Sequence, residues 1–201
     1  MKRTHTEVSA GTRLLPDGAG LVPSPTVVVA TSDRQQATEQ WLLSTHPTPD
    51  VPRQEWTDHG VALLPLGTLF SAVRIPAHLV LALTGGEEMP SPRLDVFLDE
   101  ALGGGPVICD PQGRRFYALV PASMPAKWHR ALQVLSAMGV DLLGRNSYLG
   151  VPKVDAVELN PVAWKSYWSV PMPSMAMLCE PYAVVQLIAA GQDRIEGDPQ
   201  A

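Results

Sequence analysis

The chain has 201 residues, 45% of them hydrophobic, and 20 acidic against 15 basic residues give a formal net charge of −5. This length is sufficient for one sizeable core, and no apolar stretch approaches the ~20 residues that a transmembrane helix requires. The negative charge disfavours non-specific attraction to nucleic-acid phosphates, although a local basic patch can still bind them. We therefore expect a single domain with no membrane span.

The N-terminal residues 1–24 mix glycine, proline, threonine and single charges without an apolar period, which predicts a flexible tail. Lys2 and Arg3 are not followed by the apolar segment of a secretory signal, so we expect a cytoplasmic location. Cys109 and Cys179 are the only cysteines and are not spaced as C-x-x-C. We interpret both as reduced core thiols.

The first structured part is predicted to be a strand, a helix and a hairpin. The β-branched run 26–30 is typical of a buried strand, and the polar pair 32–33 then caps a helix. Three prolines within 46–54 predict a loop. The short apolar runs 61–64 and 69–75 are interpreted as neighbouring antiparallel strands joined by a tight turn.

Two helices are predicted next. Pro76 suits the first turn of a helix that ends at Gly85 and Gly86. Ser91 is then expected to cap a second helix with Pro92 at its first position, because apolar residues recur at helical spacing up to residue 102.

The C-terminal half is predicted as a hairpin around the turn sequence Asp-Pro-Gln-Gly, a helix, two short strands and a closing helix. These elements are expected at residues 106–109, 115–120, 126–138, 149–151, 167–170 and 180–190. Gly191 is expected to end the last helix, and 192–201 to form a flexible tail. The prediction is therefore an α+β fold, with mainly antiparallel short-stranded sheets and about five helices, in one domain over 25–191.

Complete catalytic or metal-binding motifs are missing from the sequence. The five histidines are scattered, without the spacing of a zinc site. Asp95 and Asp99 lie one helical turn apart and could hold a divalent ion, but a solvated helix face is the preferred interpretation. Cys109 would be a nucleophile only with a base such as His129 beside it, and we favour a core residue. We assign no catalytic residue, metal or cofactor.

Three aromatic residues near the C-terminal third have two possible uses. They are Trp164, Tyr167 and Trp168. Such side chains can stack on bases, but aromatic residues on a short strand more often fill a core or an interface, which is the interpretation we prefer.

Several short motifs between residues 61 and 190 match those of a known family in their order and residue types. They are Gly67-Thr68 followed by the run 71–76, Gly105-Pro106-Val107, the run 113–121, and the run 167–171. In the order of these motifs the chain resembles short actinobacterial proteins that are grouped with the N-terminal domain of bifunctional DNA primase/polymerases, of the archaeo-eukaryotic primase type. The resemblance implies a domain that handles nucleotides.

The chain departs from that family at its catalytic residues. Active members are expected to carry an acidic pair at a strand end that holds two metal ions, whereas the corresponding strand here has Arg74. A family histidine that contacts nucleotide phosphates is also missing from the run that contains Arg114 and Arg115, although Gly113 and Tyr117 are retained. The resemblance therefore implies a degenerate, non-catalytic relative.

Our leading hypothesis is a non-catalytic accessory or regulatory domain that binds a protein, a nucleotide or a nucleic acid. Arg74, Arg114 and Arg115 would be its phosphate-facing residues, with at most one of the adjacent pair pointing inward because successive side chains on a strand alternate. The alternatives are a protein-interaction domain unrelated to nucleic acids and a metal-dependent nucleotidyltransferase that uses carboxylates from elsewhere in the fold, such as Asp95 and Asp99. The oligomeric state has no signal in the sequence.

Overall fold

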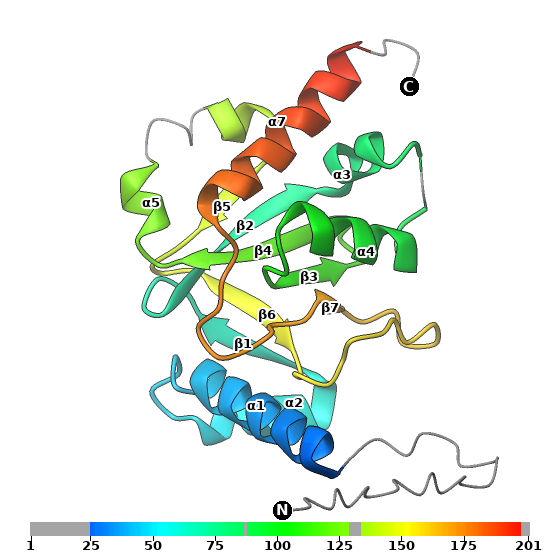
Figure 1. The fold of residues 1–201 in the computed structure, drawn as a ribbon. Coiled ribbons are helices and arrows are strands. Elements are labelled where there is room, and N and C mark those ends of the chain that lie inside the picture. The colour runs from blue at the N-terminus through cyan, green and yellow to red at the C-terminus, as the bar shows by residue number, and fades with distance from the viewer. Residues whose placement is uncertain (1–24, 87, 129–133, 198–201) are drawn as a thin grey trace, which may run out of the picture.

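The structure is a computed structural model that describes residues 25–86, 88–128 and 134–197, and it has the predicted α+β architecture (Figure 1). A five-stranded antiparallel sheet has the order β5-β2-β4-β3-β7, and a two-stranded antiparallel sheet pairs β1 with β6. The strands are β1 (Val61–Pro65), β2 (Phe70–Pro76), β3 (Val107–Asp110), β4 (Arg115–Pro121), β5 (Asp141–Leu143), β6 (Tyr148–Pro152) and β7 (Tyr167–Val170). The helices are α1 (Pro25–Leu43), α2 (Asp50–His59), α3 (Ala77–Leu83), α4 (Pro92–Ala101), α5 (Met124–Lys127) and α7 (Pro181–Gly197), and residues 134–137 are also helical. The predicted tail 1–24 lies outside the described residues.

The five-stranded sheet has a hydrophobic cluster on each face. Because side chains alternate along a strand, Leu119 packs on one side with Trp168, whereas Val120 packs on the other side with Cys109. Helices α3, α4 and α7 cover the second side, and α1, α2 and the β1–β6 pair cover the first (Figure 1). The sheet is therefore the middle layer of the molecule.

The strand predicted at 26–30 is wrong, because these residues belong to α1. The described part of this helix runs from Pro25 to Leu43. A β-branched residue in a helix costs about 0.7 kcal/mol or less relative to alanine, so continuity with the following helix outweighs the strand preference of this run.

The loop predicted at 46–54 is also wrong in its second half, where α2 begins at Asp50. Pro52 is the third residue of this helix. The N–H groups of the first turn have no partner inside a helix, so proline is tolerated there.

The predicted hairpin between residues 61–64 and 69–75 does not form, since β1 pairs with β6 and β2 pairs with β4 and β5. Between β1 and β2, Gly67 has φ of 86° and leaves so little space that a Cβ there would lie 2.4 Å from the backbone nitrogen of Arg145. The N–H of Leu66 donates to the carbonyl of Ser147 at 2.9 Å. These contacts carry the chain from one sheet to the other instead of turning it back.

Most of the remaining elements are confirmed. Ser91 caps α4 by accepting from the N–H of Arg93 at 3.2 Å, and β3 pairs with β4 in register Asp110 opposite Arg115. The single helix predicted over 126–138 is wrong at residue 128, because α5 ends at Lys127 with Trp128 as its C-cap. Residues 134–137 are helical again, and residues 129–133 lie outside the described part. Strand β5 was not predicted. None of the described helices is long and apolar enough to cross a membrane.

Gly191 does not end the last helix, as predicted, because α7 continues to Gly197. A Cβ at Gly191 would lie only 2.3 Å from the carbonyl oxygen of Leu79 in α3. This glycine therefore permits two helices to pack closely and is not a stop signal.

Candidate functional site

The three arginines predicted from the sequence line one hollow of about 220 Å³, together with Pro76, Gly113 and Gly139. The β2–β4 pairing brings them together, since Pro76 at the end of β2 lies opposite Arg115 at the start of β4. We call the surface formed by Arg74, Arg114 and Arg115 the arginine hollow.

Arg74 points from β2 toward the neighbouring edge strand β5. It lies directly opposite Asp141 in the β2–β5 register, and the two side chains form an ion pair. Both side chains are more than one third exposed, at 36% and 40%, so the pair contributes at most about 1 kcal/mol to stability. Arg74 is thus oriented at the hollow while remaining accessible.

Arg115 is held by the turn that precedes it. The Asp110 carboxylate accepts from the N–H of Gly113 at 2.9 Å, and Nε of Arg115 donates to the carbonyl of Gly113 at 3.0 Å. The second carboxylate oxygen of Asp110 lies 3.9 Å from Nε of Arg115. These contacts orient the guanidinium of Arg115, and the Asp110 carboxylate partly neutralises the positive charge of that group.

Arg114 lies in the turn itself, in the left-handed region with φ of 49°. Its backbone carbonyl accepts from the N–H of Ala77 at 3.0 Å. Strand alternation does not apply at this position, because Arg114 precedes β4. The prediction that at most one of the two arginines points inward agrees with the structure, since Arg114 is exposed and Arg115 is half-buried, and both line the hollow. Within the described residues the Arg114 guanidinium has no ion pair or hydrogen bond. The hollow is therefore lined by three arginines, and the charges of Arg74 and Arg115 are partly compensated by Asp141 and Asp110.

The residues that sequence reasoning missed are Asp141 and Gly139. Asp141 begins β5 and Gly139 precedes it, and this strand of three residues has no alternating pattern that would predict it. Only the pairing of Arg74 with Asp141 in space links them to the site.

The carboxylate pair Asp95 and Asp99 is not a preformed metal site. Asp95 accepts from the Tyr167 hydroxyl, at 3.1 Å to each oxygen, and from the Ser169 hydroxyl. Burial raises the pKa of Asp95 above its usual 3.8, and the two hydroxyl donors offset part of that rise. Among the described residues, no group of three or more His, Cys, Asp or Glu side chains is placed to hold a metal ion.

The two cysteines are free and buried, as predicted. Burial raises the pKa of each thiol to about 12, so neither is a thiolate at neutral pH. The proposed base His129 lies outside the described residues.

Of the three aromatic candidates, two are core residues. Tyr167 and Trp168 are buried on β7, as the packing interpretation predicts. Trp164 is 45% exposed in the loop between β6 and β7. Only Trp164 is accessible to a flat ligand.

No protein-family model matches the chain, and neither a curated protein nor a solved structure shows significant similarity to it.

Proposed function

We propose that the chain is a non-catalytic, primase/polymerase-like accessory or regulatory domain that binds the phosphates of a nucleotide or nucleic acid in the arginine hollow. The observation that supports this most directly is the meeting of Arg74, Arg114 and Arg115 around one solvent-accessible hollow. Guanidinium groups bind phosphate oxygens in paired, charge-assisted hydrogen bonds, which favours this ligand class over an uncharged one.

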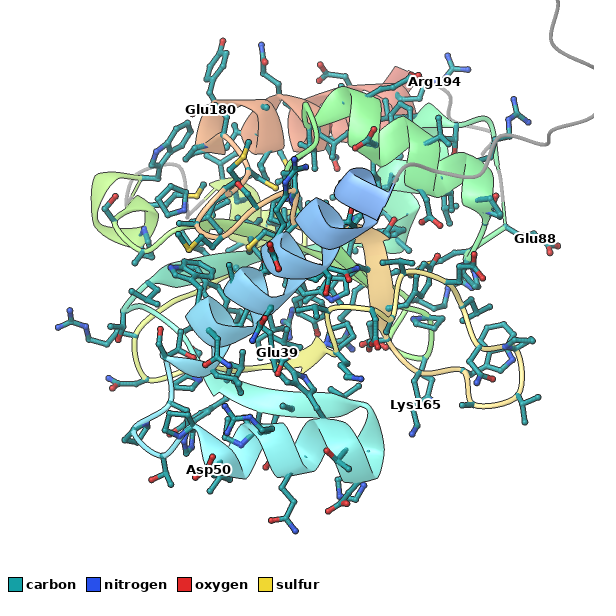
Figure 2. All side chains as sticks on the ribbon, turned by 60° about the horizontal axis from the view of Figure 1, so that its bottom comes forward. Glu39, Asp50, Glu88, Lys165, Glu180 and Arg194 are labelled. Atoms are coloured by element: carbon teal, nitrogen blue, oxygen red, sulfur yellow. The ribbon has the colours of Figure 1, made fainter. Side chains whose placement is uncertain are left out.

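The surroundings of Arg114 indicate which side of it receives the phosphate. Its other side faces a separate hollow of about 490 Å³ that is also lined by Glu88 and Met89. A carboxylate there repels phosphate, so the ligand lies between Arg114, Arg74 and Arg115. Figure 2 shows Glu88 projecting outward at the edge of the molecule.

The non-catalytic part of the proposal rests on the sites where carboxylates are needed. Arg74 stands where the acidic pair of active relatives is expected, and Asp95 is already bound by two hydroxyl groups. We expect no nucleotide incorporation with magnesium or manganese. Template-dependent incorporation that disappears when Asp95 and Asp99 are both changed to alanine would support the nucleotidyltransferase alternative instead.

The buried free thiols agree with the cytoplasmic location that we propose.

The phosphate site is tested by fluorescence anisotropy with a labelled single-stranded oligonucleotide and by calorimetry with tripolyphosphate. Arg114→Gly removes the unpaired guanidinium and suits the left-handed backbone, so the fold is retained. We expect binding to weaken about tenfold and the salt slope to fall by about 0.7 for a single strand. Arg34→Ala, which removes an exposed arginine from α1, is the charge-matched control and should have no effect. Equal binding by Arg114→Gly and the control would refute the site, as would the absence of any binding by the wild type.

A second candidate function, protein interaction, is favoured by the loop between β6 and β7, which projects from the molecule (Figure 1). The Asn160 side chain accepts from the N–H groups of Val162 and Ala163, each at 3.0 Å, and its carbonyl accepts from the N–H of Trp164 at 2.9 Å. This ordered tip leaves Val162 93% exposed beside Trp164. An exposed aliphatic and aromatic pair on a fixed turn is typical of an anchor for an apolar pocket on a partner.

The protein-interaction candidate is tested with a photoreactive residue at position 162 in cells. A discrete protein adduct is expected there and not at position 96 of α4, where the native valine is also exposed, at 59%. Identical adduct patterns at the two positions would show that the tip has no specific partner.

A further inference from the structure

A crevice of about 600 Å³ lies between α3 and the C-terminal part of α7, apart from the arginine hollow. It is lined by His78, Leu81, Ala82, Gly85, Gly86, Arg194 and Ile195. Figure 2 shows Arg194 toward the end of α7 that is distant from Glu180. The volume of the crevice lies within the range of about 300–1,000 Å³ that is typical of small-molecule sites.

The interior of the crevice is apolar and open. Leu81, Ala82 and Ile195 are partly buried side chains that form its walls. Gly85 and Gly86 have positive φ angles, and a Cβ at either position would meet no atom within 4 Å. Apart from their chain neighbours, no described residue therefore has an atom in contact with the positions beside these glycines.

Close packing of the two helices fixes the position of the walls. The contact of Gly191 with the Leu79 carbonyl holds α7 against α3, and Arg194 and Ile195 follow one helical turn later. The crevice is thus bounded by two helices that are held at a defined separation, together with the turn of Gly85 and Gly86 that follows α3.

The rim of the crevice carries the cationic side chain of Arg194 beside the imidazole of His78. His78 and Arg194 are both exposed, and within the described residues Arg194 has no ion pair. The nearby carboxylate of Glu196 accepts from the Gln192 side chain at 2.8 Å. The guanidinium of Arg194 is consequently available to an anion at the rim.

We propose that this crevice binds an amphipathic organic anion, with an apolar body between Leu81, Ala82 and Ile195 and a single carboxylate at Arg194. The apolar walls match a hydrocarbon or aromatic body, and the cationic rim matches one negative charge. A polyphosphate has no apolar body to bury and is better accommodated by the arginine hollow. The site does not depend on the phosphate-binding function.

The test compares decanoate, decanol and decyltrimethylammonium, which share one apolar chain but differ in charge, by calorimetry below micelle-forming concentrations. We expect decanoate to bind and the cation to bind at least about tenfold more weakly, since a charge-assisted hydrogen bond to Arg194 is lost. Arg194→Glu should remove the preference for the anion without disturbing packing, because this side chain is exposed. Ala82→Trp should fill the crevice and abolish binding of all three compounds.

Arg34→Ala is the control, because it removes an exposed arginine of α1 that does not line the crevice and should leave decanoate binding unchanged. Circular dichroism shows whether Ala82→Trp is folded, and Arg194→Glu tests the proposal by itself if it is not. The proposal is overturned if decanoate does not bind, if it binds Arg194→Glu as tightly as the wild type, or if folded Ala82→Trp still binds it.

Discussion

Gly191 lies in the middle of α7, where a Cβ would stand 2.3 Å from the Leu79 carbonyl oxygen and 3.0 Å from its carbon. Backbone atoms cannot rotate away as a side chain can, so any larger residue must push α7 from α3. At this residue, the absence of a side chain determines how two helices pack.

We predict that Gly191→Ala lowers the free energy of unfolding by about 1–3 kcal/mol, the usual cost of overpacking. Gly197→Ala in the same helix is the matched control, since a Cβ at Gly197 would meet no atom within 4 Å. Urea denaturation of both variants measures the difference. If Gly191→Ala were as stable as Gly197→Ala, the close α3–α7 contact would be wrong.

Asp95 is the residue whose ionisation links stability to pH. Its pKa is raised in the folded protein, chiefly by burial. The folded state therefore binds this proton more tightly than the unfolded state does. The resulting contribution to stability is fully present below the unfolded value of 3.8 and is lost as the pH rises through the folded pKa.

We predict that Asp95→Asn removes this loss, because an amide remains neutral and can still bond to the hydroxyls of Tyr167 and Ser169. As the pH is raised from 3.5 to 7, the free energy of unfolding of the variant should increase relative to that of the wild type. Urea denaturation at several pH values measures the two curves. Parallel curves over this range would contradict the raised pKa.

At the scale of elements, α4 shows how a local signal defines a helix. Ser91 precedes Pro92, and the Ser91 hydroxyl accepts from the N–H of Arg93. The cap and the proline fix the first turn, while Leu94 and Leu98 face the core. The helix start is therefore determined within four residues of sequence.

We predict that Ser91→Ala destabilises the protein by about 1 kcal/mol, because a backbone donor of the first turn loses its acceptor. Ser91→Asp should retain most of the stability, since a carboxylate can accept the same bond. Thermal denaturation followed by circular dichroism distinguishes the two variants. Equal losses for both would show that Ser91 acts through some contact other than the cap.

At the scale of the molecule, the five-stranded sheet joins the two hydrophobic clusters. Neighbouring residues such as Leu119 and Val120 belong to opposite clusters, so neither cluster can lose its packing without disturbing the strand that carries the other. This sharing of strands favours one cooperative unit.

We predict a single unfolding transition in which tryptophan fluorescence and far-ultraviolet circular dichroism coincide. Leu119→Ala in one cluster and Val184→Ala in the other should each shift the midpoints of both signals together. The free energy of unfolding should fall by about 2–4 kcal/mol for Leu119→Ala and by somewhat less for Val184→Ala, because valine is smaller. Two separable transitions would show instead that the clusters belong to independent units.

Elements whose signals lie within a few residues can be predicted from the sequence alone. Ser91-Pro92 and the apolar spacing predicted α4, and Asp-Pro-Gln-Gly predicted the β3–β4 hairpin, because caps and tight turns depend on neighbours in the chain. The α+β class followed from these elements. The candidate arginines were also named from the sequence, through a resemblance that remains a hypothesis.

Which elements meet depends on contacts between residues that are distant in the chain. The pairing of β1 with β6 joins segments far apart in sequence, and it replaced the hairpin that proximity suggested. Two other non-local pairings build the site: the β2–β5 pairing placed Arg74 beside Asp141, and the β2–β4 pairing brought Arg74 to the hollow of Arg114 and Arg115. Gly191 was predicted as a stop because its local signal is the same for a helix end and for a close helix crossing, and only the Leu79 carbonyl distinguishes the two. Register and packing arise from burial shared by distant residues, which no local pattern encodes.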